Sequence, residues 1–296
     1  MSGRFSDLIV STPGRPTVVR LLGNGKWVPI VIGVLLTAGA MAMLYPFVWM
    51  VFSAFKSNAD IATRPIRILP RDWTVSGFDS VWNASGLSRA YLNSLGVSFS
   101  IVVTTLITSS LGGYTFARLN FPGRQLLFYT ILATTMVPFI TMLIPLYLVM
   151  LDLHLLNTYT ALWLPASVSS FGIFLCRQFV LGIPADLYEA AKLDGAGDFQ
   201  IYHQIIVPLI RPVLSALAIF SFLGAFNSYL WPLVVLNNEQ LYTLPLILVR
   251  ISQTMGGTNY QAAMAGSVLA SIPTIVVYLI FQRNFVQGIA LSGIKG

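Results

Sequence analysis

Long uncharged apolar runs, separated by short polar and basic segments, divide the chain. Six runs of at least 20 residues contain no Asp, Glu, Lys, Arg or His. A helix needs about 20 mostly apolar residues to cross a bilayer, so this pattern predicts an all-α integral membrane protein with six transmembrane helices. The predicted spans are residues 27–53, 91–117, 126–151, 155–176, 212–236 and 262–281.

Composition supports lipid as the solvent for most of the chain. Of 296 residues, 56% are hydrophobic and only 9% are charged, whereas soluble domains carry about 25% charged residues. The formal charge of +7 comes from Lys and Arg that flank the apolar runs instead of clustering on one face, as basic residues do beside membrane spans. We therefore expect lipid contact and no nucleic-acid partner.

Basic residues also predict the orientation of the spans. With the N-terminus inside, the inner segments hold eleven Lys and Arg and the outer segments hold six, which places both termini in the cytoplasm. Five of the six outer ones fall in the first outer loop, against the trend. The predicted organisation is a cytoplasmic tail (1–26), a first span with its outer loop (27–90), a transmembrane core (91–283) and a cytoplasmic tail (284–296).

Six prolines lie inside the predicted spans, where each removes a backbone donor and can bend its helix. They are Pro46, Pro138, Pro145, Pro165, Pro232 and Pro273. The single cysteine and two histidines are widely spaced, so the sequence predicts neither a disulfide nor a metal site.

The longest inner loop, residues 177–211, has the pattern of two short amphipathic helices. Pro184 suits a helix start, and Gly195 suits a left-handed helix stop. A second helix is expected to begin near Asp198 and to end at Pro208. From the residues alone, this element is equally well an interfacial helix pair or a compact knob that another protein grips.

The amino-acid sequence of this loop is similar to a known motif. Glu189-Ala190-Ala191, then Gly195, then Ile205-x-Val207-Pro208, resembles the "EAA" loop of ABC importer permeases, with Val207 where the family has leucine. The resemblance implies that the loop docks in a cleft of an ATPase subunit and transmits its closure to the membrane helices. The docking residues so implied are Glu189, Ala190, Ala191, Asp194, Gly195, Ile205 and Pro208.

Two further stretches narrow the resemblance to carbohydrate importers. Phe121-Pro122-Gly123-Arg124 is similar to the inner turn of carbohydrate-type permeases, and the C-terminal segment from Phe281 to Gly296 resembles the shorter permease of maltose-type systems. In that family the tail reaches the ATPases, which implies this position for Gln282, Gly288, Lys295 and Gly296. The implied partners are a second homologous permease, two ATPase subunits and an extracytoplasmic solute-binding protein, at a bacterial inner membrane.

The energy source is expected on another chain. No P-loop, G-x-x-x-x-G-K-[ST], is present, so ATP and Mg²⁺ are assigned to partner ATPases, and this chain is expected to hold no catalytic residue and no cofactor. The alternative is an ion-coupled secondary transporter, and a channel is a further one. Proton-coupled carriers usually hold Asp, Glu or His within the bilayer, and the six spans lack them.

Polar and aromatic residues within the apolar runs are the candidates for the solute path, because sugars offer hydroxyls and flat C–H faces. They are Asn93, Thr134, Thr135, Asn227, Ser228, Tyr229 and Trp231. The outer loop 239–261 corresponds by position to the segment that such permeases present to the binding protein. The sequence leaves the solute open among oligosaccharides, polyols, sugar phosphates and uronate oligomers.

Overall fold

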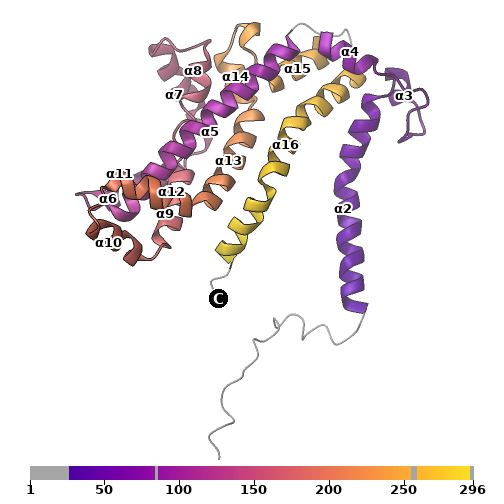
Figure 1. The fold of residues 1–296 in the computed structure, drawn as a ribbon. Helices are drawn as coiled ribbons and strands as arrows, with labels where there is room; N and C mark the ends of the chain where they lie inside the picture. Colours follow the sequence, from indigo (N-terminus) through magenta and orange to yellow (C-terminus); the bar gives the residue numbers. More distant parts are fainter. Residues whose placement is uncertain (1–26, 84–85, 255–258, 294–296) are drawn as a thin grey trace, which may run out of the picture.

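The fold is a bundle of helices around one long central helix. The computed structural model describes residues 27–83, 86–254 and 259–293, and all regular elements in this part are helical. Three helices are long and apolar enough to cross a membrane: α2 (Trp27–Ala54), α5 (Leu87–Arg118) and α16 (Tyr260–Gly293). They correspond to the first, second and sixth predicted spans (Figure 1). The predicted all-α membrane fold is confirmed.

The remaining helices are shorter, and many join at sharp angles. In chain order they are α3 (Asn58–Ala62), α4 (Ser76–Asn83), α6 (Arg124–Thr134), α7 (Phe139–Asp152), α8 (Tyr159–Trp163), α9 (Ser170–Leu181), α10 (Ala185–Leu193), α11 (Asp198–Ile201), the π-helix η1 (Tyr202–Ile206), α12 (Val207–Leu209), α13 (Arg211–Phe226), α14 (Leu230–Val235), the 3₁₀ turn η2 (Glu239–Leu241) and α15 (Leu244–Thr254). Most of the outer loop predicted at 239–261 is therefore helical.

Three of the predicted spans are broken into separate helices and not only bent at their prolines. The third is split into α6 and α7, which meet at 103°, because Pro138 follows the last turn of α6 and begins α7. The fourth is interrupted between α8 and α9, around Pro165, and the fifth between α13 and α14, at Asn227. By contrast, Pro46, Pro145 and Pro273 lie inside helices that continue past them.

The count of six remains consistent with the structure. Besides the three long helices, three bent pairs are long and apolar enough when each pair is taken together: α6 with α7, α9 with α10 at 79°, and α11–α12 with α13 at 77°. In the last two pairs, α9 and α13 belong to the predicted spans, and α10 to α12 form the loop between them. Helix α16 also continues to Gly293, beyond the predicted end of the last span at Phe281.

Helix α5 is the spine of the bundle. Its 32 residues extend about 48 Å at 1.5 Å per residue, and it contributes to three successive apolar clusters. Leu87 and Ala90 belong to the first, with α4, α15 and α16. Val97 and Ile101 belong to the second, with α7, α8 and α14, and Tyr114 to the third, with α9 to α13. One rigid element therefore connects both ends of the molecule.

Small residues allow α5 and α9 to pack closely. A Cβ built on Gly113 would lie 2.5 Å from the Cβ of Cys176 and 2.8 Å from the backbone nitrogen of Arg177. A Cβ on Gly172 would collide with the hydroxyl of Ser109. Cys176 itself is fully buried. Such small-residue contacts are the usual way in which membrane helices approach each other.

Helix α2 stands apart from the bundle and packs mainly on α16 (Figure 1). None of the residues in its most apolar stretch is buried within the chain, and side chains such as Leu35 and Met43 are 67% and 77% exposed. At its end, the Lys56 ammonium is buried over the ring of Trp49, 4.2 Å from the centroid, and donates to the carbonyl of Arg67. Burial lowers the pKa of Lys56.

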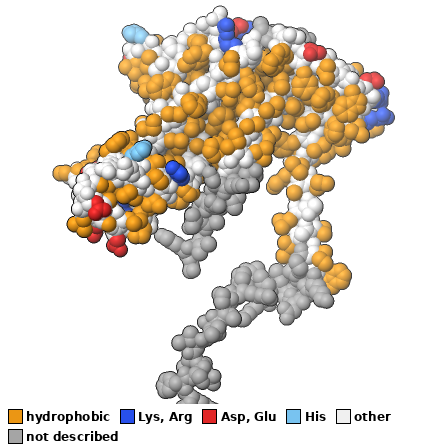
Figure 2. Space-filling model, in the orientation of Figure 1, with side chains coloured by type: hydrophobic (Ala, Val, Ile, Leu, Met, Phe, Trp, Pro, Cys, Tyr) orange, Lys and Arg blue, Asp and Glu red, His pale blue; other side chains and the backbone are white. Residues whose placement is uncertain are grey.

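Charged side chains gather at the two ends of the molecule, with a broad apolar band between them (Figure 2). One end holds α3, α4 and α15, and the other holds α10 and α11 (Figure 1). An apolar band between two polar ends is what a bilayer requires of a spanning bundle.

Substituting Gly113 by valine should separate α5 from α9, because the new side chain would overlap Cys176 and the Arg177 backbone. Overpacking of this kind costs about 1–3 kcal/mol, so we expect the purified chain to unfold several degrees lower in a thermal melt in detergent. Gly33→Ala is the matched control, since nothing lies within 4 Å of a Cβ at Gly33. Equal melting temperatures for the two variants would contradict this packing.

Candidate functional site

The loop between α9 and α13 folds as a helix, a tight turn and a second helix. Helix α10 ends in a left-handed turn at Gly195, whose φ is +82°. The N–H of Gly195 donates to the carbonyl of Lys192 at 3.1 Å, and the N–H of Ala196 donates to that of Ala191 at 3.0 Å. This pair of bonds is the Schellman motif, which favours glycine at the left-handed position. The predicted stop of the first helix at Gly195 is confirmed.

The second helix begins at Asp198, as predicted, but does not end at Pro208. It passes through the π-helix η1 and continues as α12 to Leu209, and the chain turns at Ile210. In the π turn the N–H of Val207 donates to the carbonyl of Tyr202, five residues back. Proline cannot donate to the helix ladder, and the wider π turn directly before Pro208 lets the helix continue past it.

One face of this loop packs on the bundle. Ala191, Tyr202 and Ile206 are buried in an apolar cluster with Tyr114 of α5 and Val180 of α9. Ile205, predicted as a docking residue, is half-buried beside this cluster. The loop is therefore fixed to the helices behind it through its apolar face.

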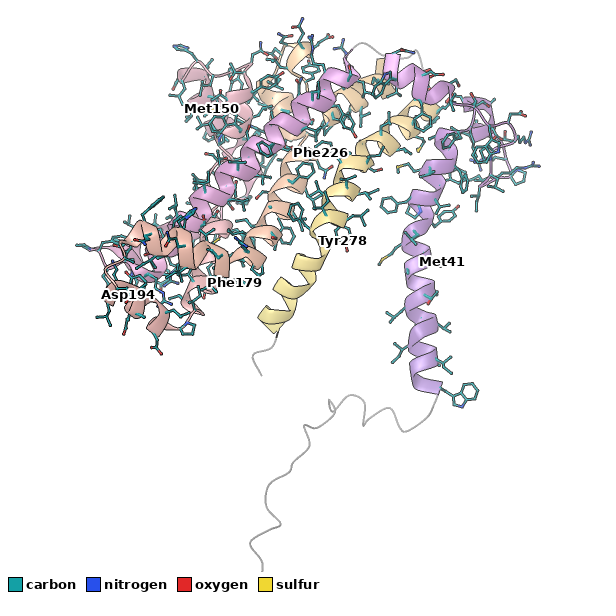
Figure 3. The ribbon with its side chains drawn as sticks, in the orientation of Figure 1. Met41, Met150, Phe179, Asp194, Phe226 and Tyr278 are labelled. Atoms are coloured by element: carbon teal, nitrogen blue, oxygen red, sulfur yellow. The ribbon has the colours of Figure 1, made fainter. Side chains whose placement is uncertain are left out.

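The opposite face is open to solvent. Glu189, Ala190 and Asp194 are exposed, and two large apolar side chains accompany them, Leu193 at 89% and Phe199 at 73% exposure. Asp194 lies at the tip of this end of the molecule (Figure 3). An exposed apolar patch with charges beside it is typical of a protein-binding surface. We refer to these five residues as the knob surface.

Asp198 joins the two helices of the loop to α5. Its Oδ1 lies 2.7 Å from Nζ of Lys192 and accepts hydrogen bonds from the hydroxyls of Tyr188 at 3.0 Å and Tyr114 at 3.4 Å. The hydroxyl of Tyr114 also lies 3.2 Å from the Asp198 carbonyl. The bonds from Lys192 and Tyr188 lower the pKa of Asp198, and the bond to Asp198 raises the pKa of Lys192.

These directions set the pH window in which the ion pair acts. Because the pKa of the Asp198 carboxyl is lowered in the folded chain, its carboxylate stabilises the fold at pH values above about 4, the ordinary carboxyl pKa. This stability is lost as the pH falls below that value. Because the pKa of the Lys192 ammonium is raised, its charge stabilises the fold at pH values below about 10, and this stability is lost as the pH rises further. The pair between Asp198 and Lys192 is thus intact across the physiological range.

Arg118, the last residue of α5, makes a second connection. Its guanidinium donates to the carbonyl of Val180 at 3.1 Å and to that of Ile183. These two carbonyls lie at the end of α9 and before α10, and the Val180 carbonyl also accepts the N–H of Ile183 at 3.2 Å. Arg118 and Asp198 therefore attach the loop to the same end of α5.

A cavity of about 480 Å³ lies where the broken helices meet. Trp231 forms part of its wall, held by a hydrogen bond from its Nε1 to the carbonyl of Ala161 at 2.8 Å, and its ring meets that of Phe139 edge-on at 6.3 Å. The lining comes from α5, α7, α8, α13 and α14, from the segments between α8 and α9 and between α13 and α14, and from Thr243 just before α15. It comprises Val97, Ile101, Thr105, Phe139, Met142, Leu146, Leu162, Pro165, Ala166, Ser169, Ser221, Gly224, Ala225, Ser228, Trp231, Pro232 and Thr243.

Of the seven path residues suggested by the sequence, Ser228 and Trp231 line this cavity. Asn93 lines a smaller one of about 290 Å³ with Tyr159 and Trp163. The Asn93 side chain is engaged there, because it donates to the carbonyls of Gln240 and Tyr242, both at 2.9 Å, and accepts from Tyr159 at 2.7 Å.

The other four path candidates line neither of these cavities. The hydroxyls of Thr134 and Thr135 bond to backbone carbonyls of α6, and Thr134 also lies 2.9 Å from the Ser170 hydroxyl. Asn227 donates to the carbonyl of Leu223. These side chains satisfy the ends of broken helices, and Tyr229 lies at the start of α14.

Several cavity residues were not anticipated, notably Thr105, Phe139, Ser169, Ser221 and Thr243. Most are single hydroxyls in apolar runs, and the sequence does not show which of many such residues face inward. Phe139 directly follows Pro138, so a break predicted at that proline would have placed it at a helix start.

The C-terminal residues suggested by the resemblance are only partly covered. Gln282 and Gly288 lie on α16, which continues in line from the last span. Lys295 and Gly296 lie outside the described residues. Among the described residues, no group of three or more His, Cys, Asp or Glu side chains is arranged to hold a metal ion.

Broken apolar helices around a cavity, with a two-helix loop at one end, are features of a membrane permease. The chain belongs to the family of binding-protein-dependent transport system inner membrane components, whose sequence profile matches residues 105–291. The predicted resemblance of the chain to the permeases of ABC carbohydrate importers is confirmed by this family and by the relatives that follow.

Among the relatives, the arabinooligosaccharides transport system permease protein AraQ of Halalkalibacterium halodurans is 36% identical, over 88% of this chain and 96% of its own. The diacetylchitobiose uptake system permease protein NgcG of Streptomyces coelicolor is 33% identical, over 86% and 85%. A chain of a bacterial ABC transporter that imports the acidic polysaccharide alginate superposes with a TM-score of 0.78 at 27% identity, covering 93% of this chain and all of that one.

Replacing Asp198 by asparagine should loosen the loop, because the neutral amide loses the charge-assisted bond from Lys192. The two side chains are 47% and 38% exposed, so the effect is modest, and we expect roughly two- to five-fold faster hydrogen exchange at the amides of α10. Asp186→Asn, an exposed residue of the same helix, should leave exchange unchanged. Equal hydrogen-exchange rates at the α10 amides in Asp198→Asn and Asp186→Asn would show that Asp198 does not connect the loop to α5.

Proposed function

We propose that this chain is the membrane-spanning permease subunit of an ATP-driven importer for a saccharide. A separate ATPase drives it by binding the loop of α10 and α11. The observation that carries this proposal is the knob surface. The loop packs on α5 through its apolar face, and the knob surface on the opposite face is exposed. The printed names of the relatives, which are permeases for arabinooligosaccharides and for diacetylchitobiose, support a saccharide as the solute.

The ATPase engages the knob surface. Leu193 and Phe199 supply apolar contact area, Ala190 permits close approach, and Glu189 and Asp194 offer charges for basic partner residues. Since Asp198 and Arg118 attach the loop to α5, displacement of the loop tilts α5 as a unit. ATP and Mg²⁺ act on the ATPase, and this chain carries out no bond chemistry.

A second, homologous permease covers α2. This helix is apolar along its length and unburied within the chain, with Leu35, Met41 and Met43 each two thirds exposed or more (Figure 3). A helix that leaves its own bundle in this way offers a surface for another bundle as well as for lipid. Two permeases side by side would present two knob surfaces to a pair of ATPases.

The opposite end of the molecule receives the solute from an extracytoplasmic binding protein. The helices α3, α4 and α15 lie there, away from α10 and α11 (Figure 1). With the knob surface in the cytoplasm, both termini of the chain are cytoplasmic, in agreement with the excess of inner Lys and Arg. The membrane is the bacterial inner membrane.

Substituting Gly195 by proline tests the coupling role. Proline fixes φ near −65° and has no N–H, whereas Gly195 requires a φ of +82° and donates to Lys192. We expect loss of ATP-dependent saccharide uptake, at least ten-fold, in proteoliposomes of the complete complex, with normal membrane insertion of the variant. Gly197→Ala is the control, since its φ of −71° and free space accept a side chain.

Uptake near the wild-type rate in Gly195→Pro would refute this role of the loop. Uptake that continues without nucleotide and follows an ion gradient would instead identify a secondary transporter.

A further inference from the structure

The segment between α3 and α4 carries positive charge against the trend of the rest of the chain. Five of the six Lys and Arg on the predicted outer side lie in the first outer loop, and three of them, Arg64, Arg67 and Arg71, fall within residues 64–74. We call residues 64–74 the arginine segment. Basic residues beside membrane spans usually gather on the cytoplasmic side, so the charge of this segment needs another explanation.

The arginine segment is fixed against the end of α2. The buried Lys56 ammonium donates to the carbonyl of Arg67, and the N–H of Thr74 donates to the carbonyl of Phe55 at 3.0 Å. The ring of Trp73 packs on that of Phe55, with 5.7 Å between the centroids. Both anchors lie within two residues of the end of α2, whose most apolar stretch is unburied within the chain. The segment therefore lies at the level where this helix leaves the hydrocarbon of the bilayer.

Apolar and basic side chains share the surface of the segment. Ile66, Leu69 and Trp73 are each more than half exposed, and Arg64 and Arg67 are exposed beside them. Basic and apolar side chains lie next to one another at the end of the molecule that holds α3 (Figure 2). Tryptophan is enriched at the boundary between membrane and water, and clustered Lys and Arg there attract anionic lipid. This mixture suits the headgroup level of a bilayer.

Two of the three guanidinium groups have no acidic partner. Among the described residues, the ion pair of this segment is that of Arg71, whose Nε lies 3.9 Å from Oδ1 of Asp60. The same carboxylate accepts the Arg71 N–H at 3.0 Å, so it is engaged within the segment. Asp72 is exposed and forms no ion pair with Arg64 or Arg67. These two guanidinium groups are left to bind an anion, and their planar geometry matches that of phosphate oxygens.

We infer that the arginine segment binds the phosphate headgroups of anionic phospholipids. Arg64 and Arg67 contact the phosphates, while Ile66, Leu69 and Trp73 enter the boundary layer beneath them. A lipid is favoured over an acidic protein because the segment is fixed beside a helix that faces lipid and exposes large apolar side chains together with its charges. The inference goes beyond the proposed function, which supplies only the leaflet, the extracytoplasmic one.

The first test measures lipid binding by the full chain in detergent. Native mass spectrometry with phosphatidylglycerol, an anionic lipid, and with phosphatidylcholine, which has no net charge, gives a dissociation constant for each. We expect tighter binding of phosphatidylglycerol, and a loss of about ten-fold in its affinity in Arg64→Gln/Arg67→Gln, because each basic residue near an anionic surface adds to the attraction. Arg64→Lys/Arg67→Lys keeps both charges and should retain most of the affinity.

A matched control removes two charges elsewhere. Arg89 and Arg211 are exposed and lie at the starts of α5 and α13, and Arg89→Gln/Arg211→Gln should bind phosphatidylglycerol as the wild type does. Equal losses in the two double glutamine variants overturn the inference, because they assign the effect to net charge. Wild-type affinity in Arg64→Gln/Arg67→Gln overturns it as well.

The same variants separate a lipid from a protein partner. If Arg64→Gln/Arg67→Gln binds phosphatidylglycerol normally but loses affinity for the solute-binding protein, the arginines contact an acidic protein surface, and the lipid inference is overturned. None of these measurements depends on transport, so their failure leaves the permease function standing.

The second test measures depth in proteoliposomes that contain phosphatidylglycerol. A spin label on Leu69→Cys should be more accessible to oxygen, which concentrates in lipid, than to a water-soluble nickel complex. A label on Asp194→Cys, at the tip of the knob surface (Figure 3), should show the reverse. Equal accessibility profiles at the two positions would place the arginine segment in water and overturn the inference.

Discussion

The structure depends on one constraint: in lipid, every backbone N–H and C=O needs a partner within the protein. The three helices that are each long enough to cross a membrane, α2, α5 and α16, are unbroken across their apolar stretches. Breaks occur where α6 meets α7, α8 approaches α9 and α13 meets α14. At these breaks the freed groups are satisfied by nearby hydroxyls, amides and turns, as with Ser169 and Asn227, and the same breaks surround the larger cavity. The polar interior of this bundle thus follows from interrupting helices and needs no charged residue.

Helix α5 connects the loop of α10 and α11 to the larger cavity. Its last turns hold the loop of α10 and α11 through Tyr114 and Arg118, and Val97, Ile101 and Thr105 along its middle line the cavity. A helix is stiff along its axis, so movement at one end changes the position of the other. The close fit of Gly113 against Cys176 makes α9 move with α5 and not slide past it. In the proposed function, movement of the loop passes through this packed helix pair.

Much of this could be predicted from the sequence, for physical reasons that differ by element. The apolar runs predicted the spans because length and lack of charge are enough to define them. Gly195 predicted the helix stop because few residues other than glycine adopt its left-handed conformation readily. The effects of proline were predicted less well: Pro46 and Pro273 are accommodated inside helices, whereas Pro138 begins one. Pro208 lies within a helix because of a π turn, which has no local sequence signature. The cavity required tertiary structure, since a serine such as Ser228 looks the same in sequence whether or not it lines a cavity.

The single cysteine has a practical consequence. Cys176 is fully buried against α5, out of reach of water-soluble thiol reagents, and it need not be removed before probes are attached to engineered cysteines elsewhere in the chain. Spin labels or fluorophores introduced on α10 and on α3 would report the separation of the two ends of the native protein directly. Distance distributions recorded through a nucleotide cycle would then measure the movement of the bundle without altering its tightest helix contact.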